Sequence, residues 1–156
     1  MYTNIMVAVD GSPSSQRALD EGLKVARSHG ARLFAVFVVD KSLMITFGGR
    51  MDPDALLDEI RRDGASVLRH VERTIAHAAV NGETELLETE IGESVAERLQ
   101  RYVVERSIDL AVVGTHGRRG VRRLFLGSVA ERFLRGSSCP VLLVRGSDAA
   151  PAAAAA

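Results

Sequence analysis

Apolar residues gather in four short, nearly continuous runs, and segments with helical patterns fill the gaps between them. The runs comprise residues 5–9, 33–39, 110–113 and Val141–Val144. Short apolar runs without alternation are typical of strands covered on both faces, as in a parallel sheet. A fifth segment, residues 84–91, carries three glutamates and predicts a more polar strand at a sheet edge.

Two of the predicted helices begin with a capping residue that is followed by proline at the first helical position, a favourable start. They run from Ser12-Pro13 to Gly30 and from Asp52-Pro53 to Asn81-Gly82. The segment before the second of them, residues 41–50, is either a flap over a ligand or a long connection.

Two further helices begin with a serine that is followed three residues later by glutamate, the pattern of a capping box. The pairs are Ser94 with Glu97 and Ser128 with Glu131, and the last helix is expected to end near Gly136. Strands that alternate with helices predict right-handed crossovers and an open α/β sheet.

Composition narrows the class of protein. A length of 156 residues favours one domain, and twenty Lys and Arg balance twenty Asp and Glu. This balance argues against a general binder of nucleic acid or of acidic membranes. No apolar stretch is long enough to span a bilayer and no signal peptide precedes the first run, so a soluble cytoplasmic protein is expected. The lone Cys139 excludes an intrachain disulfide and is expected to be a small buried residue at a strand entrance.

The segment VVGTHGRRGVRRLFLGS, residues 112–128, carries the candidate chemistry. Gly114, Gly117 and Gly127 follow a predicted strand, and Ser128 opens a helix. Glycines allow backbone N–H groups to converge on phosphate oxygens, and a helix N-terminus favours negative charge. The alternative is that these are ordinary turn glycines and that Ser128 only caps the helix.

The spacing Gly114-x-x-Gly117, nine residues, then Gly127-Ser128 resembles the nucleotide-binding signature of the universal stress protein family, in its ATP-binding branch. The opening NIMVAVDGSPSSQRAL and the closing LGSVAERFLRGSSCPVLLVR are also similar to that family. The resemblance covers residues 3–145 and is weakest across 41–82. It implies a Rossmann-like fold: an open, mainly parallel five-stranded sheet of order 3-2-1-4-5 with helices on both faces. The domain would span residues 1–146, followed by an Ala-rich, unpacked tail over residues 147–156.

In such a sheet, the chain reverses its direction of winding between strands 1 and 4, and ligands bind at that switch point. Asp10 and Gly114 would both lie there. The resemblance implies ATP as the ligand, with any Mg²⁺ or Mn²⁺ carried by the phosphates. The implied contacts are Ala8, Val9 and Asp10 for the base or ribose, Val38 for the adenine, Val113 and Gly114 for the ribose, and Gly117, Gly127, Ser128 and Val129 for the phosphates. Asp10 has an alternative role as the organiser of a turn.

Four arginines, Arg118, Arg119, Arg122 and Arg123, follow the glycine pair, and Arg118 is expected to help neutralise the phosphates. His116 is expected to be a polar loop residue, because nothing in the sequence supplies the partner that a general base needs. No catalytic and no metal-ligating residue is predicted.

These observations lead to an ATP-binding stress-response protein that acts as a dimeric, nucleotide-dependent regulatory module. A slow ATPase or phosphotransferase and a nucleotide-independent interaction scaffold are the alternatives, and an unidentified protein partner is compatible with each. Because the apolar Val141–Val144 strand would lie at a sheet edge, we expect it to pair with the same strand of a second copy.

Overall fold

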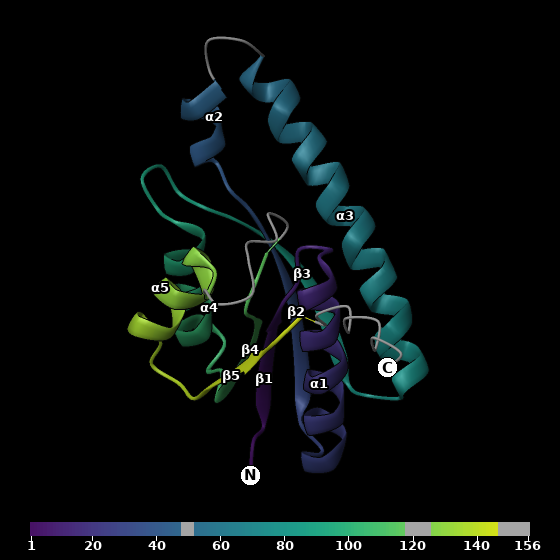
Figure 1. Ribbon diagram of the computed structural model, residues 1–156. Helices are drawn as coiled ribbons and strands as arrows, with labels where there is room; N and C mark the ends of the chain where they lie inside the picture. The colour runs from purple at the N-terminus through teal and green to yellow at the C-terminus, as the bar shows by residue number, and fades with distance from the viewer. Residues whose placement is uncertain (48–51, 118–125, 147–156) are drawn as a thin grey trace, which may run out of the picture.

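The chain forms one five-stranded parallel sheet with strand order β3-β2-β1-β4-β5, as the sequence predicts (Figure 1). The structure is a computed structural model that describes residues 1–47, 52–117 and 126–146. The strands are β1 (Asn4–Ala8), β2 (Arg32–Val39), β3 (Gly82–Glu88), β4 (Leu110–Gly114) and β5 (Val141–Val144). The helices are α1 (Pro13–His29), α2 (Ser42–Phe47), α3 (Pro53–Ala78), α4 (Val95–Glu105) and α5 (Ser128–Gly136).

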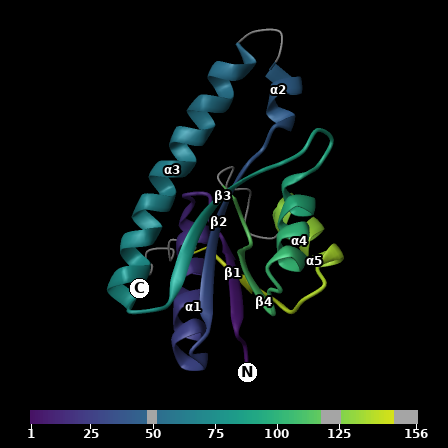
Figure 2. The same cartoon turned by 180° about the vertical axis from the view of Figure 1, so that it is seen from behind.

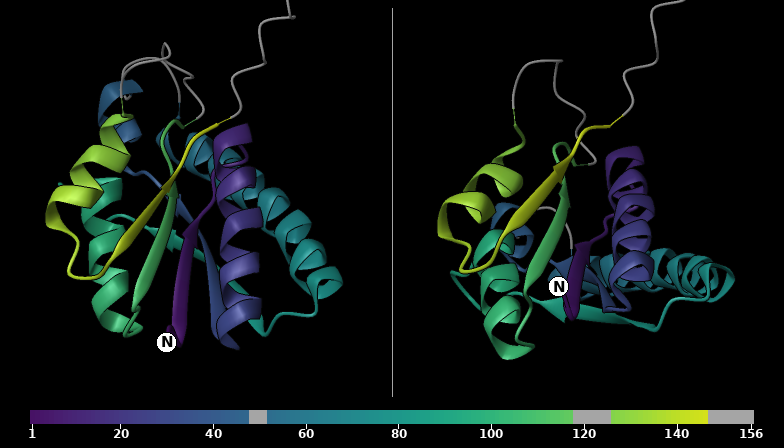
Figure 3. Two further views of the ribbon diagram at one scale, coloured as in Figure 1. Left: turned by 60° about the horizontal axis from the view of Figure 1, so that its bottom comes forward. Right: turned by 90° about the horizontal axis from the view of Figure 1, so that it is seen from below.

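The helices cover both faces of the sheet and bury two separate cores. α1 and α3 lie on one face, and α4 and α5 lie on the other (Figure 3). Leu19 and Val71 represent the first core, whereas Tyr102 and Phe133 are buried in the second. Because each central strand is covered twice, its residues are apolar on both faces, which explains the uninterrupted runs. Among the described residues, no helix is both long enough and apolar enough to cross a membrane.

The local signals predict the helix starts better than the helix ends. Ser12 caps α1 by accepting a hydrogen bond from the Ser15 N–H, and the capping box of α4 is present in full. α3 ends at Ala78, earlier than the predicted Asn81-Gly82, because Ala79 adopts a left-handed conformation with φ of 52°. The sequence analysis also missed α2, a short helix that occupies part of the segment expected to be a flap or a connection.

β3 begins and ends earlier than the predicted strand of residues 84–91, since it spans Gly82–Glu88. The strand stops at Glu88, and the chain then turns through Gly92, which has a φ of 83°. Ile91, predicted to end the strand, is instead 93% exposed.

Cys139 lies directly before Pro140 and β5 as expected, but it is half-buried and its N–H donates to Ser137 Oγ at 3.4 Å.

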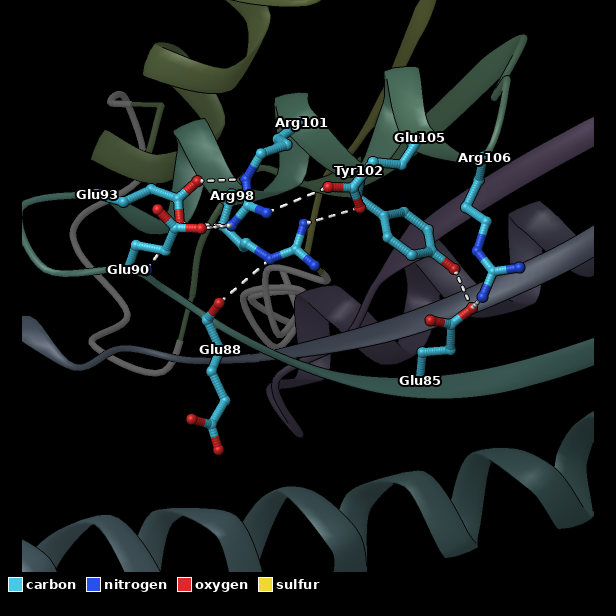
Figure 4. Close-up of polar contacts among 9 residues, drawn as sticks. All are labelled: Glu85, Glu88, Glu90, Glu93, Arg98, Arg101, Tyr102, Glu105 and Arg106. Atoms are coloured by element: carbon cyan, nitrogen blue, oxygen red, sulfur yellow. Dashed lines mark hydrogen bonds and ion pairs between the residues drawn. The ribbon is translucent and has the colours of Figure 1, made fainter.

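Carboxylates of β3 and of the segment after it bind α4 and its C-cap residue through ion pairs and hydrogen bonds. Tyr102 Oη donates to Glu85 Oε1 at 2.7 Å, and Arg106 reaches the same oxygen (Figure 4). Burial, and then the hydrogen bond to Glu85, raise the pKa of Tyr102 above its usual value. Arg101 pairs with Glu93 at 2.9 Å near the start of the helix and lowers the pKa of that carboxyl. Polar side chains thus attach the edge strand to α4 and place charge along an edge that would otherwise invite aggregation.

On the opposite face, Glu88 connects three segments of the chain. Its carboxylate accepts from Arg61 Nε at 2.6 Å and pairs with Lys41 Nζ at 2.9 Å. Arg61 belongs to α3, and Lys41 directly precedes α2. Glu88 therefore holds the part of the molecule where α2 and the start of α3 extend beyond the carboxyl end of the sheet (Figure 2).

Replacing Glu88 with glutamine is expected to lower the free energy of unfolding at neutral pH by about 1–2 kcal/mol. Hydrogen bonds from Arg61 and Lys41 lower the pKa of Glu88 from 4.5 to about 2. A lowered pKa stabilises the fold above the unfolded-state value, and the stabilisation disappears as the pH falls towards 2. Denaturant unfolding across this range should show the difference between wild type and Glu88→Gln shrinking with acidity. A difference that stays constant with pH would contradict this assignment.

Candidate functional site

The carboxyl ends of β1 and β4 lie side by side in the middle of the sheet. β1 pairs with β4 through Ile5↔Leu110 and Val7↔Val112, and with β2 on its other side. The chain leaves β1 towards one edge of the sheet and returns on β4 towards the other. This is the switch point at which open α/β sheets bind ligands.

Asp10 organises the turn that follows β1. Its Oδ1 accepts from the Ser12 N–H at 2.8 Å, and its own N–H donates to Ser15 Oγ at 3.3 Å. The turn-forming role considered for Asp10 is therefore present. Gly117 approaches the other carboxylate oxygen, because a Cβ built on Gly117 would lie 3.2 Å from Asp10 Oδ2. The loop after β4 thus reaches the end of β1, as the sequence analysis expects.

Gly114 allows the first turn of α1 to pack directly against the end of β4. A Cβ at this position would lie 2.5 Å from Ser14 Oγ and 2.9 Å from the Ser14 carbonyl carbon and oxygen. Real Cβ atoms do not approach backbone atoms so closely, so the residue must be glycine for steric reasons. Its role in the fold is close packing.

The start of α5 returns to the same loop. The Gly127 N–H donates to the Thr115 carbonyl at 2.7 Å, and the Gly127 carbonyl accepts from the Glu131 N–H at 2.9 Å. Gly127 is the N-cap residue, with extended φ and ψ of −60° and 149°, and among the described residues no side chain caps this helix. The predicted capping box of Ser128 and Glu131 is therefore wrong: Ser128 is the first helical residue, one position too late to cap.

This shift leaves the Ser128 hydroxyl exposed at the amino end of α5. Val129 follows it and is 40% exposed. Glu131 instead forms an ion pair with Arg135 one turn later, at 2.8 Å. The first backbone N–H groups of the helix are therefore next to the glycine loop, where the dipole and these donors favour an anion.

The remaining predicted contacts divide according to the face of the sheet. Val113 is buried in the α4–α5 core, and Val9 is buried in the α1–α3 core, so their side chains are occupied in packing. Ala8 and Val38 are half-buried and pack against the α4–α5 core. At these positions, mainly the backbone is left available for a ligand.

Val38 is placed to offer such backbone groups. The Val9 N–H donates to the Val36 carbonyl at 2.9 Å, beyond the last pair of the β1–β2 ladder, Ala8↔Val36. In a parallel ladder, alternate residues direct their N–H and C=O to the same neighbour. Val38 therefore directs its polar groups past the end of β1, at the same carboxyl end as Asp10.

A cleft of about 390 Å³ opens on the other side of the β1–α1 turn, between α1 and α3. It is lined by Ser12, Ser15 and Gln16 and, on α3, by Ser66 and His70 among others. Of the predicted site residues that the structure describes, Val9 alone contributes to it. The cleft is thus adjacent to the glycine loop but does not coincide with it.

His116 does not have the surroundings of a general base. Its Nδ1 lies 2.9 Å from Thr115 Oγ1, and its Nε2 is buried with no hydrogen-bond partner within the described parts of the chain. Those parts also contain no group of three His, Cys, Asp or Glu residues that would hold a metal ion. Arg118, Arg119, Arg122 and Arg123 lie outside the described residues.

The sequence analysis missed two residues that support the loop from inside the fold. Ser14 and Thr115 are both buried, and they connect the loop to α1 and β5. Ser14 looks like part of a capping run, and Thr115 looks like any residue between glycines. Ser14 bonds residues more than a hundred positions away, and Thr115 bonds Val144 and Gly127, so no local pattern shows the importance of either.

A parallel sheet of this order, with a glycine loop and a helix start at its switch point, defines a Rossmann-like α/β domain. The sequence matches the family model of the Universal stress protein family over residues 1–145, and the chain belongs to this family. Universal stress protein YxiE of Bacillus subtilis is 31% identical over 152 residues, covering 93% of this chain and 100% of that protein.

Solved structures agree with this assignment. A universal stress protein from Burkholderia pseudomallei is 38% identical with a TM-score of 0.74, covering 91% of this chain and 95% of that one. A universal stress protein in complex with cAMP is 25% identical with a TM-score of 0.67, covering 94% and 98% of the two chains.

Proposed function

We propose that this chain binds an adenine nucleotide, ATP first among them, at the carboxyl end of β1 and β4, and acts as a nucleotide-dependent regulatory module in a stress response. The observation that carries the proposal is the convergence of two loops. Gly117 approaches Asp10 from the β4 side, and Gly127 is hydrogen-bonded to Thr115 at the start of α5. The backbone groups suited to phosphate and those suited to a nucleoside therefore meet at one place.

Phosphate oxygens would be bound at the amino end of α5. The exposed Ser128 hydroxyl, freed from any capping role, is available as a donor beside the first N–H groups of the helix. Magnesium or manganese would arrive on the phosphates themselves. In this proposal, Arg118 neutralises part of the negative charge of the phosphates.

The adenine would lie towards the ends of β1 and β2. The N–H and C=O of Val38 form an adjacent donor and acceptor, which matches the pattern of an adenine edge. Ala8 is small and half-buried at the end of the neighbouring strand, so it leaves room for a flat ring. The related universal stress protein in complex with cAMP supports an adenine nucleotide as the class of ligand.

Binding with little turnover is the form of this activity that the site favours. A histidine that acts as a general base usually has a carboxylate bonded to its Nδ1, which orients the ring. In His116, Nδ1 contacts Thr115 Oγ1 instead. A slow ATPase would require groups that the described loop residues do not supply. Measurement of ADP release over hours distinguishes the two, since turnover that Ser128→Ala abolishes would establish an enzyme.

We also propose that the module is a homodimer formed through β5. This strand pairs with β4 on one side and is the last strand of the sheet on the other. Its four residues are all apolar, and Leu142 is 36% exposed. Antiparallel pairing with β5 of a second copy satisfies both edges under a two-fold axis.

Substituting Ser128 with alanine is expected to weaken ATP binding about three- to tenfold, because it removes one hydrogen-bond donor to the phosphates. Isothermal titration calorimetry with ATP, ADP, AMP and cAMP, each with and without magnesium, measures the effect. Ser28 is an exposed serine near the carboxyl end of α1, so Ser28→Ala is the matched control and should bind ATP like wild type. If no nucleotide produces binding heat or thermal stabilisation with wild type, the proposed function is wrong.

A further inference from the structure

Thr115 connects the amino end of α5 to the end of the edge strand through its own backbone. Its N–H donates to the Val144 carbonyl at 2.9 Å, and its carbonyl accepts from the Gly127 N–H at 2.7 Å. Gly127 in turn accepts from Glu131 in the first turn of α5. A continuous row of backbone hydrogen bonds therefore runs from the last residue of β5, through the loop, into the helix start.

Ser14 reinforces this connection from α1. Its Oγ donates to the Val144 carbonyl at 3.4 Å and accepts from the His116 N–H at 3.4 Å. Ser14 is 4% exposed and Thr115 is 8% exposed, so the junction is shielded from water. Gly114 packs against the same serine, and a Cβ on Gly146 would lie 3.5 Å from its Cβ. The end of β5 thus cannot move without displacing the loop or the first turn of α1.

We infer that nucleotide bound at the amino end of α5 tightens the pairing of β5 with β5 of a second copy, and that Thr115 and Ser14 transmit this effect. The inference rests on the proposed nucleotide site and names its regulation. A ligand that fixes Gly127 and Ser128 also fixes Thr115, and with it the Val144 carbonyl. An edge strand that is already ordered loses less conformational entropy when it pairs.

Thermodynamic linkage relates the dimer dissociation constant to the nucleotide affinity, so the coupling can be measured in two ways. If nucleotide tightens the dimer by a given factor, dimerisation must tighten nucleotide binding by the same factor. We expect a factor of about five or more, within the usual range of coupling between two sites. Sedimentation equilibrium with and without saturating ATP gives the dimer dissociation constant, and calorimetry gives the nucleotide affinity.

Three variants test the coupling and its path. Ser14→Ala should bring the coupling factor close to one while still binding ATP. Ser15→Ala removes a similarly buried serine of the same turn, whose hydroxyl bonds Ser12 and Asp10 but not β5, so it should keep the coupling factor of wild type even where the ATP affinity itself falls. Leu142→Asp places a charge on the open edge strand, and the resulting monomer should bind ATP more weakly by the wild-type factor.

The outcomes separate this inference from the proposed function. ATP binding with the same dimer dissociation constant in its presence and absence overturns the coupling and leaves the nucleotide site standing. A protein that stays monomeric with ATP also overturns it. Equal coupling in Ser14→Ala and wild type removes Ser14 from the path. Absence of any nucleotide binding in calorimetry defeats the proposed function, and the coupling with it.

Discussion

Replacing Gly114 with alanine is expected to lower the free energy of unfolding by about 1–3 kcal/mol, the usual cost of adding atoms to a packed interior. The new methyl group would lie 2.9 Å from the carbonyl carbon and oxygen of Ser14. The Ser14 hydroxyl can rotate away, but its backbone is held in the first turn of α1. The helix or the strand must therefore shift. Denaturant unfolding at equilibrium measures the loss of stability.

Gly146 provides a matched control for this substitution because it contacts the same serine. A Cβ on Gly146 would lie 3.5 Å from Ser14 Cβ, an ordinary van der Waals distance. Gly146→Ala should therefore change the free energy of unfolding by less than about 0.5 kcal/mol. If the two variants are equally stable, the close approach of α1 to β4 is not the reason for glycine at position 114.

The sheet could be predicted from the sequence because its signals are local and its topology rules are strong. The run over residues 110–113 is apolar at every position because helices cover both faces of this strand. The order of the strands came from family resemblance, and the structure confirms it. Helix starts at Ser12 and Ser94 were predictable because capping depends on neighbouring residues.

The errors have physical causes. Ser128 and Glu131 match a capping box in sequence, but Gly127 takes the N-cap position because its N–H is bound to Thr115. A tertiary hydrogen bond thus moves the helix start by one residue. α3 ends at Ala78 because Ala79 adopts a left-handed conformation, although no glycine marks the end. The hydrogen bond from Gly127 to Thr115 cannot be detected by patterns that consider only nearby residues.

The candidate site was predictable in its position and less so in its construction. Asp10 and Gly117 come together because strands 1 and 4 are neighbours, which follows from the sheet order. The junction of Ser14, Thr115 and Val144 depends instead on how closely α1 packs against two strand ends. That packing is a property of the whole fold.

Replacing Gly117 with leucine is expected to weaken ATP binding by at least about 100-fold, equivalent to about 2.7 kcal/mol, with almost no loss of stability. The side chain would begin 3.2 Å from Asp10 Oδ2, the single contact within 4 Å of a Cβ at this position among the described residues. It would extend into the space between the loop and the end of β1, where the nucleoside is proposed to lie. Because Gly117 is exposed, the free energy of unfolding should change by less than about 0.5 kcal/mol.

This combination of effects distinguishes a binding site from a structural loop. If the glycine only allowed the loop to fold, leucine would lower stability and affinity together. If the nucleotide bound elsewhere, for example in the cleft between α1 and α3, leucine would change neither property. Calorimetry and denaturant unfolding on the same preparation separate the three cases. Ser28→Leu, at an exposed position near the end of α1, controls for the added apolar surface. Only occupation of the space beside Asp10 predicts lost binding in a protein as stable as wild type.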